Sequence, residues 1–166
     1  MVPLLLECSL SRVERLLEEG DALFEKEEPD GALEKYRDAL ALDPESHRAH
    51  FSLGVVHYSR QDYPRALEAL HRAVELESER APYLLQRGHT LLRLRRFDEA
   101  IRDYEEVIRL DPSRARAYYS VGIAYYNSRD YEKAAHWLRR YLKIAPRAED
   151  RERVQQLILS LEAWSS

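Results

Sequence analysis

The chain is poor in cysteine and has no long apolar run. Cys8 is the single cysteine among 166 residues, which excludes an internal disulfide framework and is typical of a reducing compartment. No apolar run approaches the roughly 18 residues that span a bilayer. The apolar stretch at residues 2–6 has no basic region before it and is too short for a signal-peptide core. We therefore expect a cytoplasmic protein with no membrane span.

Motifs that carry chemistry are also missing. The sequence has no glycine loop that would cradle phosphate, no nucleophile elbow and no paired catalytic carboxylates. The net charge is −4 and charged residues make up 34% of the chain, a balance unlike that of a nucleic-acid-binding domain. The sequence thus predicts a soluble protein that is not an enzyme, has no cofactor and does not bind nucleic acid.

What the sequence does contain is a repeat of 34 residues. Four of the five glycines lie in one register, as do four alanines, and a proline recurs in three of four repeats, with Ser78 in the remaining place. These columns are Gly20, Gly54, Gly88 and Gly122; Ala32, Ala66, Ala100 and Ala134; and Pro44, Pro112 and Pro146. A period of this length with two helices per repeat indicates an array of stacked helical hairpins.

The last repeat carries the clearest family pattern. Its key positions are Tyr118, Val121, Gly122, Tyr125, Ala134, Leu138, Tyr141 and Pro146. In these residues the chain resembles the tetratricopeptide repeat family over residues 13–148. The resemblance implies an all-α fold, a right-handed superhelical solenoid of stacked antiparallel helix hairpins. It predicts one domain over 1–166, with repeats at 13–46, 47–80, 81–114 and 115–148 and a capping helix at 149–164.

Helix limits follow from capping and proline signals. Ser11 and Glu14 have the spacing of a capping box, so we expect the first helix to run from about Arg12 to Lys26. Pro29 suits the first position of the second helix, which should end near Leu42, before Pro44. The remaining helices are predicted at 47–60, 63–76, 81–94, 97–110, 115–128 and 131–144. Asp62 and Asp130 are expected as N-caps, whereas Arg96 gives a weaker start.

The final helix should cap the array. Its apolar stripe recurs at helical spacing on an otherwise polar rod. The stripe consists of Val154, Leu157, Ile158, Leu161 and Trp164. A terminal repeat would otherwise expose its stacking face, so we expect all five side chains to pack.

Two faces of each first helix have different predicted roles. The glycine-centred face is core, because glycine lets the partner helix approach closely. One residue further along lies the face that, in the resembled family, lines a concave inner surface where peptides or partner helices bind. With its rim, the predicted partner-binding set is Leu17, Asp21, Phe24, Arg48, Phe51, Val55, Tyr58, Leu85, His89, Leu92, Arg93, Arg116, Tyr119, Ile123, Tyr126 and Asn127.

Most of this inner set is apolar or aromatic, which has two interpretations. One is a groove that selects apolar side chains, and the other is packing between neighbouring repeats. The rim changes sign from Glu14, Asp21 and Glu25 to Arg48, Arg93 and Arg116. This change indicates either a gradient that orients a charged partner or ordinary scattered surface charge.

Three further groups have simpler readings. Family members that bind chaperone tails hold a terminal carboxylate with Lys and Asn, but the matching places here are Leu17, Asp21, Ser52, Pro82 and Gln86. His50 and His57 occupy columns filled elsewhere by Leu or Tyr, so they are predicted core histidines and not metal ligands. The basic turn Arg93, Arg95 and Arg96 is followed by Asp98, Glu99 and Asp103, which favours surface pairing over phosphate binding.

The sequence therefore predicts a protein-interaction adaptor that binds an apolar or amphipathic segment, as a helix in a groove or as an extended peptide. Two alternatives remain open: a chaperone-like holder of hydrophobic segments, and a scaffold that self-assembles into homo-oligomers through the apolar residues Val2–Leu6.

Overall fold

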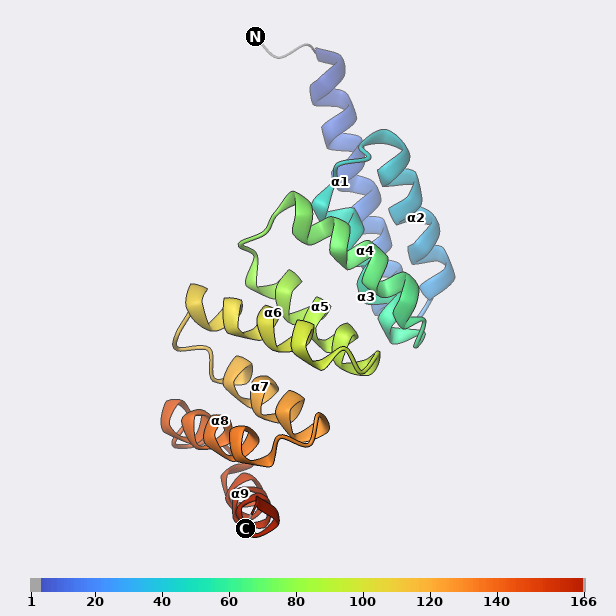
Figure 1. Cartoon of the computed structure of the whole chain (residues 1–166). Coiled ribbons are helices and arrows are strands. Elements are labelled where there is room, and N and C mark those ends of the chain that lie inside the picture. Colours follow the sequence, from blue (N-terminus) through green and yellow to red (C-terminus); the bar gives the residue numbers. More distant parts are fainter. Residues whose placement is uncertain (1–3, 166) are drawn as a thin grey trace. The chain divides into compact units, whose positions relative to one another are not determined.

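The computed structural model describes the backbone of residues 4–165 and the side chains of residues 12–164. Within that range the chain forms nine helices and no strands (Figure 1). The all-α prediction is confirmed. The chain divides into two compact units, unit 1 over residues 1–83 and unit 2 over residues 84–166.

Antiparallel helix pairs build both units. Unit 1 holds the first four helices and the start of the fifth, and unit 2 holds the rest. Their bounds are α1 (Leu4–Glu25), α2 (Pro29–Leu42), α3 (His47–Ser59), α4 (Tyr63–Leu76), α5 (Ala81–Arg93), α6 (Phe97–Leu110), α7 (Ala115–Asn127), α8 (Tyr131–Ile144) and α9 (Arg151–Ser165). No helix in the described part of the chain is both long and apolar enough to cross a bilayer.

The predicted helix limits hold except at the two ends of the chain. α1 starts at Leu4 and not near Arg12, so Ser11 lies inside the helix and is not its N-cap. Nothing between residues 4 and 10 breaks a helix, and the first turns of α1 extend past α2 in Figure 1. The proposed assembly segment Val2–Leu6 falls outside the described side chains. The last helix begins at Arg151, two residues later than predicted.

Capping differs between helices as the sequence predicts. The Asp62 side chain accepts a hydrogen bond from the Arg65 amide at 3.4 Å, and Asp130 accepts one from the Lys133 amide at 3.2 Å. Arg96 makes no such bond. α2 begins with Pro29 and ends at Leu42, which places the Asp43–Pro44 pair outside the helix.

The turn inside each hairpin repeats one backbone motif. Glu27, Gln61, Arg95 and Arg129 have φ of 61°, 62°, 61° and 66°, the left-handed region that favours glycine. At the α3–α4 turn the Asp62 amide donates to the His57 carbonyl at 2.9 Å, and the Gln61 amide donates to the Tyr58 carbonyl at 2.9 Å. This is the Schellman pattern, and the other three turns have the same pair of bonds. Each hairpin therefore holds a strained non-glycine residue at the same place.

The glycine column allows close helix packing. A Cβ atom at Gly54 would lie 2.5 Å from Leu70 Cγ, and one at Gly88 would lie 2.5 Å from Tyr104 Cε1. Such distances are too short for a real side chain, so the predicted role of this column is confirmed. The same face meets Tyr36 at Gly20 and Leu138 at Gly122.

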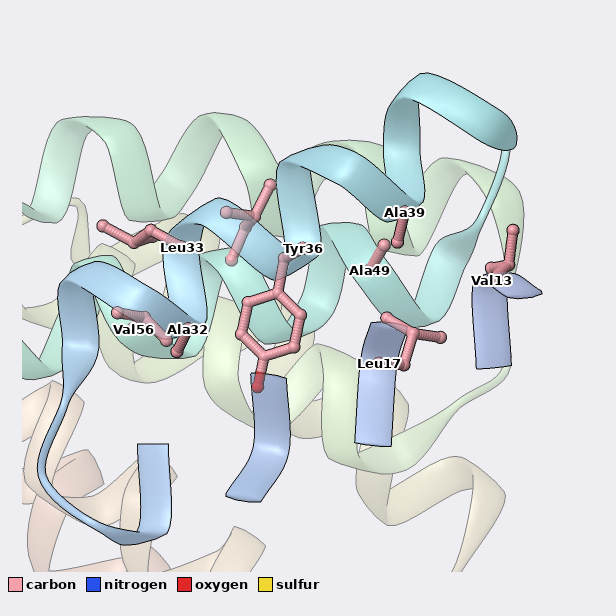
Figure 2. Close-up of a cluster of buried hydrophobic side chains, with 9 residues drawn as sticks. Val13, Leu17, Ala32, Leu33, Tyr36, Ala39, Ala49 and Val56 are labelled. Atoms are coloured by element: carbon pink, nitrogen blue, oxygen red, sulfur yellow. The ribbon is translucent and has the colours of Figure 1, made fainter. Parts of the chain in front are cut away.

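Each unit has its own hydrophobic core. In unit 1, Figure 2 shows the Tyr36 ring directed from α2 towards α1, in a cluster that includes Leu17 and Val56. In unit 2, Leu138 and Tyr141 of α8 pack with Val154, Ile158 and Leu161 of α9. α9 is therefore part of the unit 2 core.

One residue of the predicted cap is not buried. Trp164 is 60% exposed, although Val154, Ile158 and Leu161 are buried and Leu157 is half-buried. Trp164 lies a turn beyond Leu161, where its ring contacts Tyr131 at a centroid distance of 5.5 Å. Leu159 is 66% exposed. It lies 34 residues after Tyr125 of α7 and is therefore in the same column. In α7 that column faces the second helix of the hairpin.

Candidate functional site

The inner face of unit 1 begins with a residue that is not accessible. Leu17 is only 1% exposed and belongs to the core cluster in Figure 2, so it cannot contact a partner in this structure. Phe24, two columns further, is half-buried and packs against the same cluster. At this end the predicted binding columns act as core.

The polar residues of unit 1 bond to one another. Arg48 forms ion pairs with Glu14 and, at 3.3 Å, with Asp21. The Tyr36 hydroxyl donates to Asp21 at 2.7 Å. Burial, followed by this bond to a carboxylate, raises the pKa of Tyr36 well above its ordinary value. Arg48 thus belongs to the acidic part of the rim, where its charge is neutralised.

The aromatic residues of unit 1 also have partners. Phe51 stacks on Tyr83 with a centroid distance of 4.5 Å and an interplanar angle of 24°. The Tyr83 hydroxyl lies 2.7 Å from His47 Nδ1. Tyr58 meets Tyr63 edge to face at 5.5 Å. Val55, between these rings in sequence, is half-buried. The inner columns of unit 1 are thus largely used for contacts within the unit.

In unit 2 the inner columns of α5 carry Leu85, His89 and Leu92, all half-buried. The His89 ring lies 5.6 Å from that of Tyr104. Burial, with a smaller contribution from the charge of Arg116, lowers the pKa of His89 to about 4. The imidazole is therefore neutral at pH 7.

The inner columns of α7 are aromatic and branched. Tyr119, Ile123 and Tyr126 are half-buried. Tyr119 meets Tyr141 edge to face at 5.3 Å. A series of rings continues across three helices, because Tyr126 lies 6.1 Å from Tyr131 and Tyr131 lies 5.5 Å from Trp164. We call the residues Leu85, His89, Leu92, Tyr119, Ile123 and Tyr126 the unit 2 surface.

The polar edge of the unit 2 surface is basic. Arg93 and Arg116 are exposed, and no carboxylate of the described residues lies at ion-pair distance from Arg116. Asn127 donates through Nδ2 to the Ile123 carbonyl at 2.8 Å, so its side-chain amide is bonded to its own helix. In the basic turn Arg96 pairs with Glu99 at 2.6 Å, and Arg95 lies 5.6 Å from the Phe97 ring centroid.

Three histidines of unit 1, His50, His57 and His71, line a separate pocket of about 980 Å³. His57 is buried, and burial lowers its pKa although Asp62 lies 3.9 Å away. His50 Nε2 lies 2.9 Å from the Pro44 carbonyl oxygen. Among the described residues no group of three or more His, Cys, Asp or Glu side chains has the geometry to hold a metal.

Sequence reasoning missed two contributors, Tyr131 and Trp164. Tyr131 occupies the first position of α8, where α4 has Tyr63 and α6 has Phe97. The recurrence of an aromatic residue there was a usable signal, because Tyr63 contacts Tyr58 as Tyr131 contacts Tyr126. Trp164 gave no such signal, since it lies in an apolar stripe that looked entirely buried.

Comparison with known proteins gives a consistent assignment. A family model described as tetratricopeptide repeat matches residues 17–83 and 85–149. The chain is 32% identical over 108 residues to DnaJ homolog subfamily C member 3 of Bos taurus, a match that covers 64% of this chain and 21% of that protein. The Gallus gallus protein is 28% identical over 144 residues, covering 77% and 28%. The chain thus spans less than a third of the length of these relatives.

Solved structures share the fold. The crystal structure of MamA is 27% identical, with a TM-score of 0.77, and the match covers 86% of this chain and 83% of that one. The first tetratricopeptide repeat domain of Spaghetti (RPAP3), solved with the HSP90 peptide SRMEEVD, has a TM-score of 0.67 at 22% identity and covers 69% of this chain and 90% of that one. The match of the family model to two regions that together span most of the sequence is decisive: the chain belongs to the tetratricopeptide repeat family.

Proposed function

We propose that this protein is a non-catalytic adaptor whose unit 2 surface binds an apolar or amphipathic segment of a partner protein. The observation that carries the proposal is the group of half-buried apolar and aromatic side chains on α5 and α7, which continues to the exposed Trp164. Aromatic side chains that are partly exposed and held by neighbours can bury much area with little loss of rotamer freedom.

The basic edge adds a preference for charge. Arg93 and Arg116 border the unit 2 surface, whereas unit 1 presents Glu14, Asp21 and Glu25. A segment with an apolar stripe and acidic residues beside it matches the unit 2 surface and its edge. Such a segment differs from a terminal carboxylate held by paired Lys and Asn, because the matching places in this chain lack that pair.

A resemblance in fold to peptide-bound domains supports the adaptor class and leaves the peptide open. The Spaghetti (RPAP3) domain was solved with an acidic peptide, and a second similar structure is the complex of the TPR2B domain of yeast Sti1 with pHsp70. Both show what those proteins bind. For this chain we propose that apolar side chains provide most of the affinity.

The test is a selection from a display library of random peptides of about 16 residues, enough for four helical turns. The selected peptides should carry two or more large apolar side chains at helical or alternating spacing. Replacing Tyr119 and Tyr126 by Ala should weaken their binding by about 2–4 kcal/mol, roughly 30- to 1,000-fold, while the circular dichroism spectrum stays helical.

A matched control is Trp137→Ala, which removes a half-buried aromatic residue of α8 outside the inner columns. It should leave peptide affinity unchanged. Peptides that bind the Tyr119→Ala/Tyr126→Ala variant as well as the wild type would refute the proposal. Selection of many unrelated apolar peptides with similar affinity would instead identify a general holder of hydrophobic segments.

A further inference from the structure

The outward faces of the second hairpin helices carry a charge pattern with the same register in every repeat. Four exposed positions recur at spacings of four, three and four residues. In α2 and the turn after it they are Glu34, Asp38, Ala41 and Glu45, and in α8 and the turn after it they are His136, Arg140, Lys143 and Arg147. We call these two sets the acidic stripe and the basic stripe.

The intervening repeats show that the sign changes stepwise. The matching residues in α4 and the turn after it are Glu68, Arg72, Glu75 and Glu79. In α6 and the turn after it they are Arg102, Glu106, Arg109 and Ser113. The units as a whole follow the same trend. Residues 1–83 contain 18 acidic and 10 basic residues, a net charge of −8, whereas residues 84–166 contain 12 acidic and 16 basic residues, a net charge of +4.

Few charges of the acidic stripe and the basic stripe are neutralised by the described residues. Among the described residues no ion pair is formed by Glu34 or Asp38, nor by Lys143 or Arg147, and Glu45 has only a long contact of 3.8 Å to Arg72. Neighbouring opposite charges are engaged elsewhere: Lys35 pairs with Glu19 at 2.6 Å, and Arg139 pairs with Glu162. Arg37 and Arg72 are exposed basic residues beside the acidic stripe.

Arg140 is held in place by aromatic rings. Its guanidinium lies 4.4 Å from the Trp137 ring centroid and 5.0 Å from that of Tyr118. A guanidinium stacked on rings keeps its charge and loses side-chain freedom before any partner arrives. The centre of the basic stripe is therefore pre-organised.

An exposed apolar residue accompanies each stripe at the same register. Leu42 is 40% exposed and Ile144 is 41% exposed, and both are the last residues of their helices. The equivalent residues of the middle repeats, Leu76 and Leu110, are less exposed. The two stripes are thus matched in spacing, opposite in charge and alike in their apolar side chain.

We infer that the acidic stripe of one copy of this chain binds the basic stripe of a second copy. The spacing reads the same in both directions, so three acidic residues meet three basic or histidine side chains whether the helices run parallel or antiparallel. In the parallel alignment Leu42 also meets Ile144. The helical part of each stripe, such as Glu34 to Ala41, is about 10 Å long, the rise of seven helical residues.

A second copy fits the basic stripe better than a long polyanion. A nucleic acid or an anionic membrane must also approach the −8 charge of unit 1 in the same chain, which repels it at low salt. The acidic stripe of a second copy is short, and that copy also carries the +4 charge of its own unit 2, so two whole chains repel each other less than a chain and a long polyanion do. Because the contact is small and charged, it should be weak and dependent on salt.

The test uses sedimentation velocity of the full chain over a range of concentrations at low salt. The wild type should associate as concentration rises and return to a monomer at about 1 M salt, where the Debye length is about 3 Å. Glu34→Lys/Asp38→Lys gives two basic stripes, and Lys143→Glu/Arg147→Glu gives two acidic stripes. Each variant alone should associate at least about tenfold more weakly than the wild type.

Mixing the two variants provides the decisive comparison. The basic stripe of the first variant then meets the acidic stripe of the second, so the mixture should regain an association constant within about threefold of the wild type. A matched control is Arg95→Glu/Arg129→Glu. It makes the same change in charge as Lys143→Glu/Arg147→Glu, but at turn positions where the first repeat has Glu27. It should associate as the wild type does.

Three results would overturn the inference. The first is a wild type that remains monomeric at low salt and high concentration. The second is association that neither variant weakens, or that mixing does not restore. The third is a monomeric wild type that binds anionic lipid vesicles or duplex DNA through Lys143 and Arg147, since the basic stripe would then serve a different partner.

Discussion

In unit 1 the inner columns of α1 and α3 include a buried residue, Leu17, and a charged one, Asp21, whereas in unit 2 the same columns of α5 and α7 are half-buried throughout and, apart from His89, apolar or aromatic. Asp21 collects bonds from Tyr36 and Arg48, and Phe51 stacks on Tyr83. The residues that take the place of Asp21 in unit 2 are His89, neutral at pH 7, and Ile123. Within this column Asp21 alone carries a carboxylate, and it bonds to side chains of α2 and α3.

A second pair of positions, one on each helix of a hairpin, is polar in some repeats and apolar in another. In the first repeat Glu19 of α1 pairs with Lys35 of α2 at the surface, and two repeats later Arg87 of α5 pairs with Asp103 of α6. The acid and base have changed helices, and the second pair is buried. In the repeat between them the same places hold Leu53 and Ala69. The hairpin thus accepts either an ion pair or an apolar pair at one site.

The largest expected effect concerns α9, which exists only in unit 2. Ending the chain at Ala148 exposes the partners of Val154, Ile158 and Leu161, three buried side chains worth about 1.5–3 kcal/mol each as an upper estimate. The melting temperature should fall sharply, or the product should aggregate. Leu161→Ala in the full chain, with an expected cost of about 2–5 kcal/mol, separates loss of packing from loss of chain. A truncated protein that melts within a few degrees of the full chain would show α9 to be dispensable.

The next effect tests the buried ion pair. Arg87 donates to Asp103 through two nitrogens at 2.8 and 2.6 Å, and their side chains are 17% and 7% exposed. Asp103→Ala leaves a buried guanidinium and should cost about 3–5 kcal/mol of unfolding free energy in a urea titration.

Copying the middle repeat should rescue this loss. The double variant Arg87→Leu/Asp103→Ala reproduces the Leu53–Ala69 pair and should recover most of the stability, since replacing both members of a buried pair by apolar groups is often close to neutral. A double variant that is no more stable than Asp103→Ala would contradict the equivalence of the two repeats. Glu19→Ala, at the exposed pair of unit 1, should leave the melting temperature nearly unchanged.

The pH dependence of the unfolding free energy should distinguish His89 of unit 2 from Val55, which occupies the same column in unit 1. His89 has a folded-state pKa of about 4 against an ordinary 6.5. Between these values the unfolded chain binds a proton that the folded chain does not, so stability is lost as pH falls from about 6.5 to 4. The loss approaches about 3 kcal/mol.

His89→Val copies Val55 of unit 1 and should remove this component. The measurement is the difference in unfolding free energy between wild type and variant across the pH range, in which the carboxylates common to both proteins cancel. Parallel curves for the two proteins from pH 7 to pH 4 would show that His89 is not held neutral.

The smallest effect lies in the turns. Gln61 in unit 1 and Arg95 in unit 2 adopt left-handed φ of 62° and 61°. Glycine there relieves strain but adds freedom to the unfolded chain, so Gln61→Gly should stabilise by roughly 0.5 kcal/mol. Arg95→Gly should gain less, because it also removes the contact with Phe97. Thermal unfolding of both variants decides this, and a lower melting temperature for Gln61→Gly would argue against strain at the turn.

The periodic positions made most of the fold predictable. Glycine and alanine columns identify the close helix contacts, and Asp62, Asp130 and Pro29 mark helix starts, because these features act locally and recur every 34 residues. The start of α1 was not predictable from Ser11, since a capping signal inside a run of helix-compatible residues does not force the chain to begin there. The exposure of Trp164 was equally hidden, because helical spacing gives a face and not the length of the surface that covers it.

The sequence predicted which positions form the candidate site, but it did not predict which side chains they contact. The pairing of Arg48 with Glu14 and Asp21, the burial of Leu17 and the stack of Phe51 on Tyr83 depend on side chains from neighbouring helices. No single column contains that information. This is why the sequence left open whether the inner face is a groove or packing.

The central claim is that the unit 2 surface, and not the inner face of unit 1, contacts the partner segment. It is tested most directly by placing a photo-reactive benzophenone side chain at Ile123 or, in a second protein, at Val55. These two half-buried positions share one column. A library-selected peptide should cross-link efficiently at position 123 and only weakly at position 55. Equal or stronger cross-linking at position 55 would contradict the account.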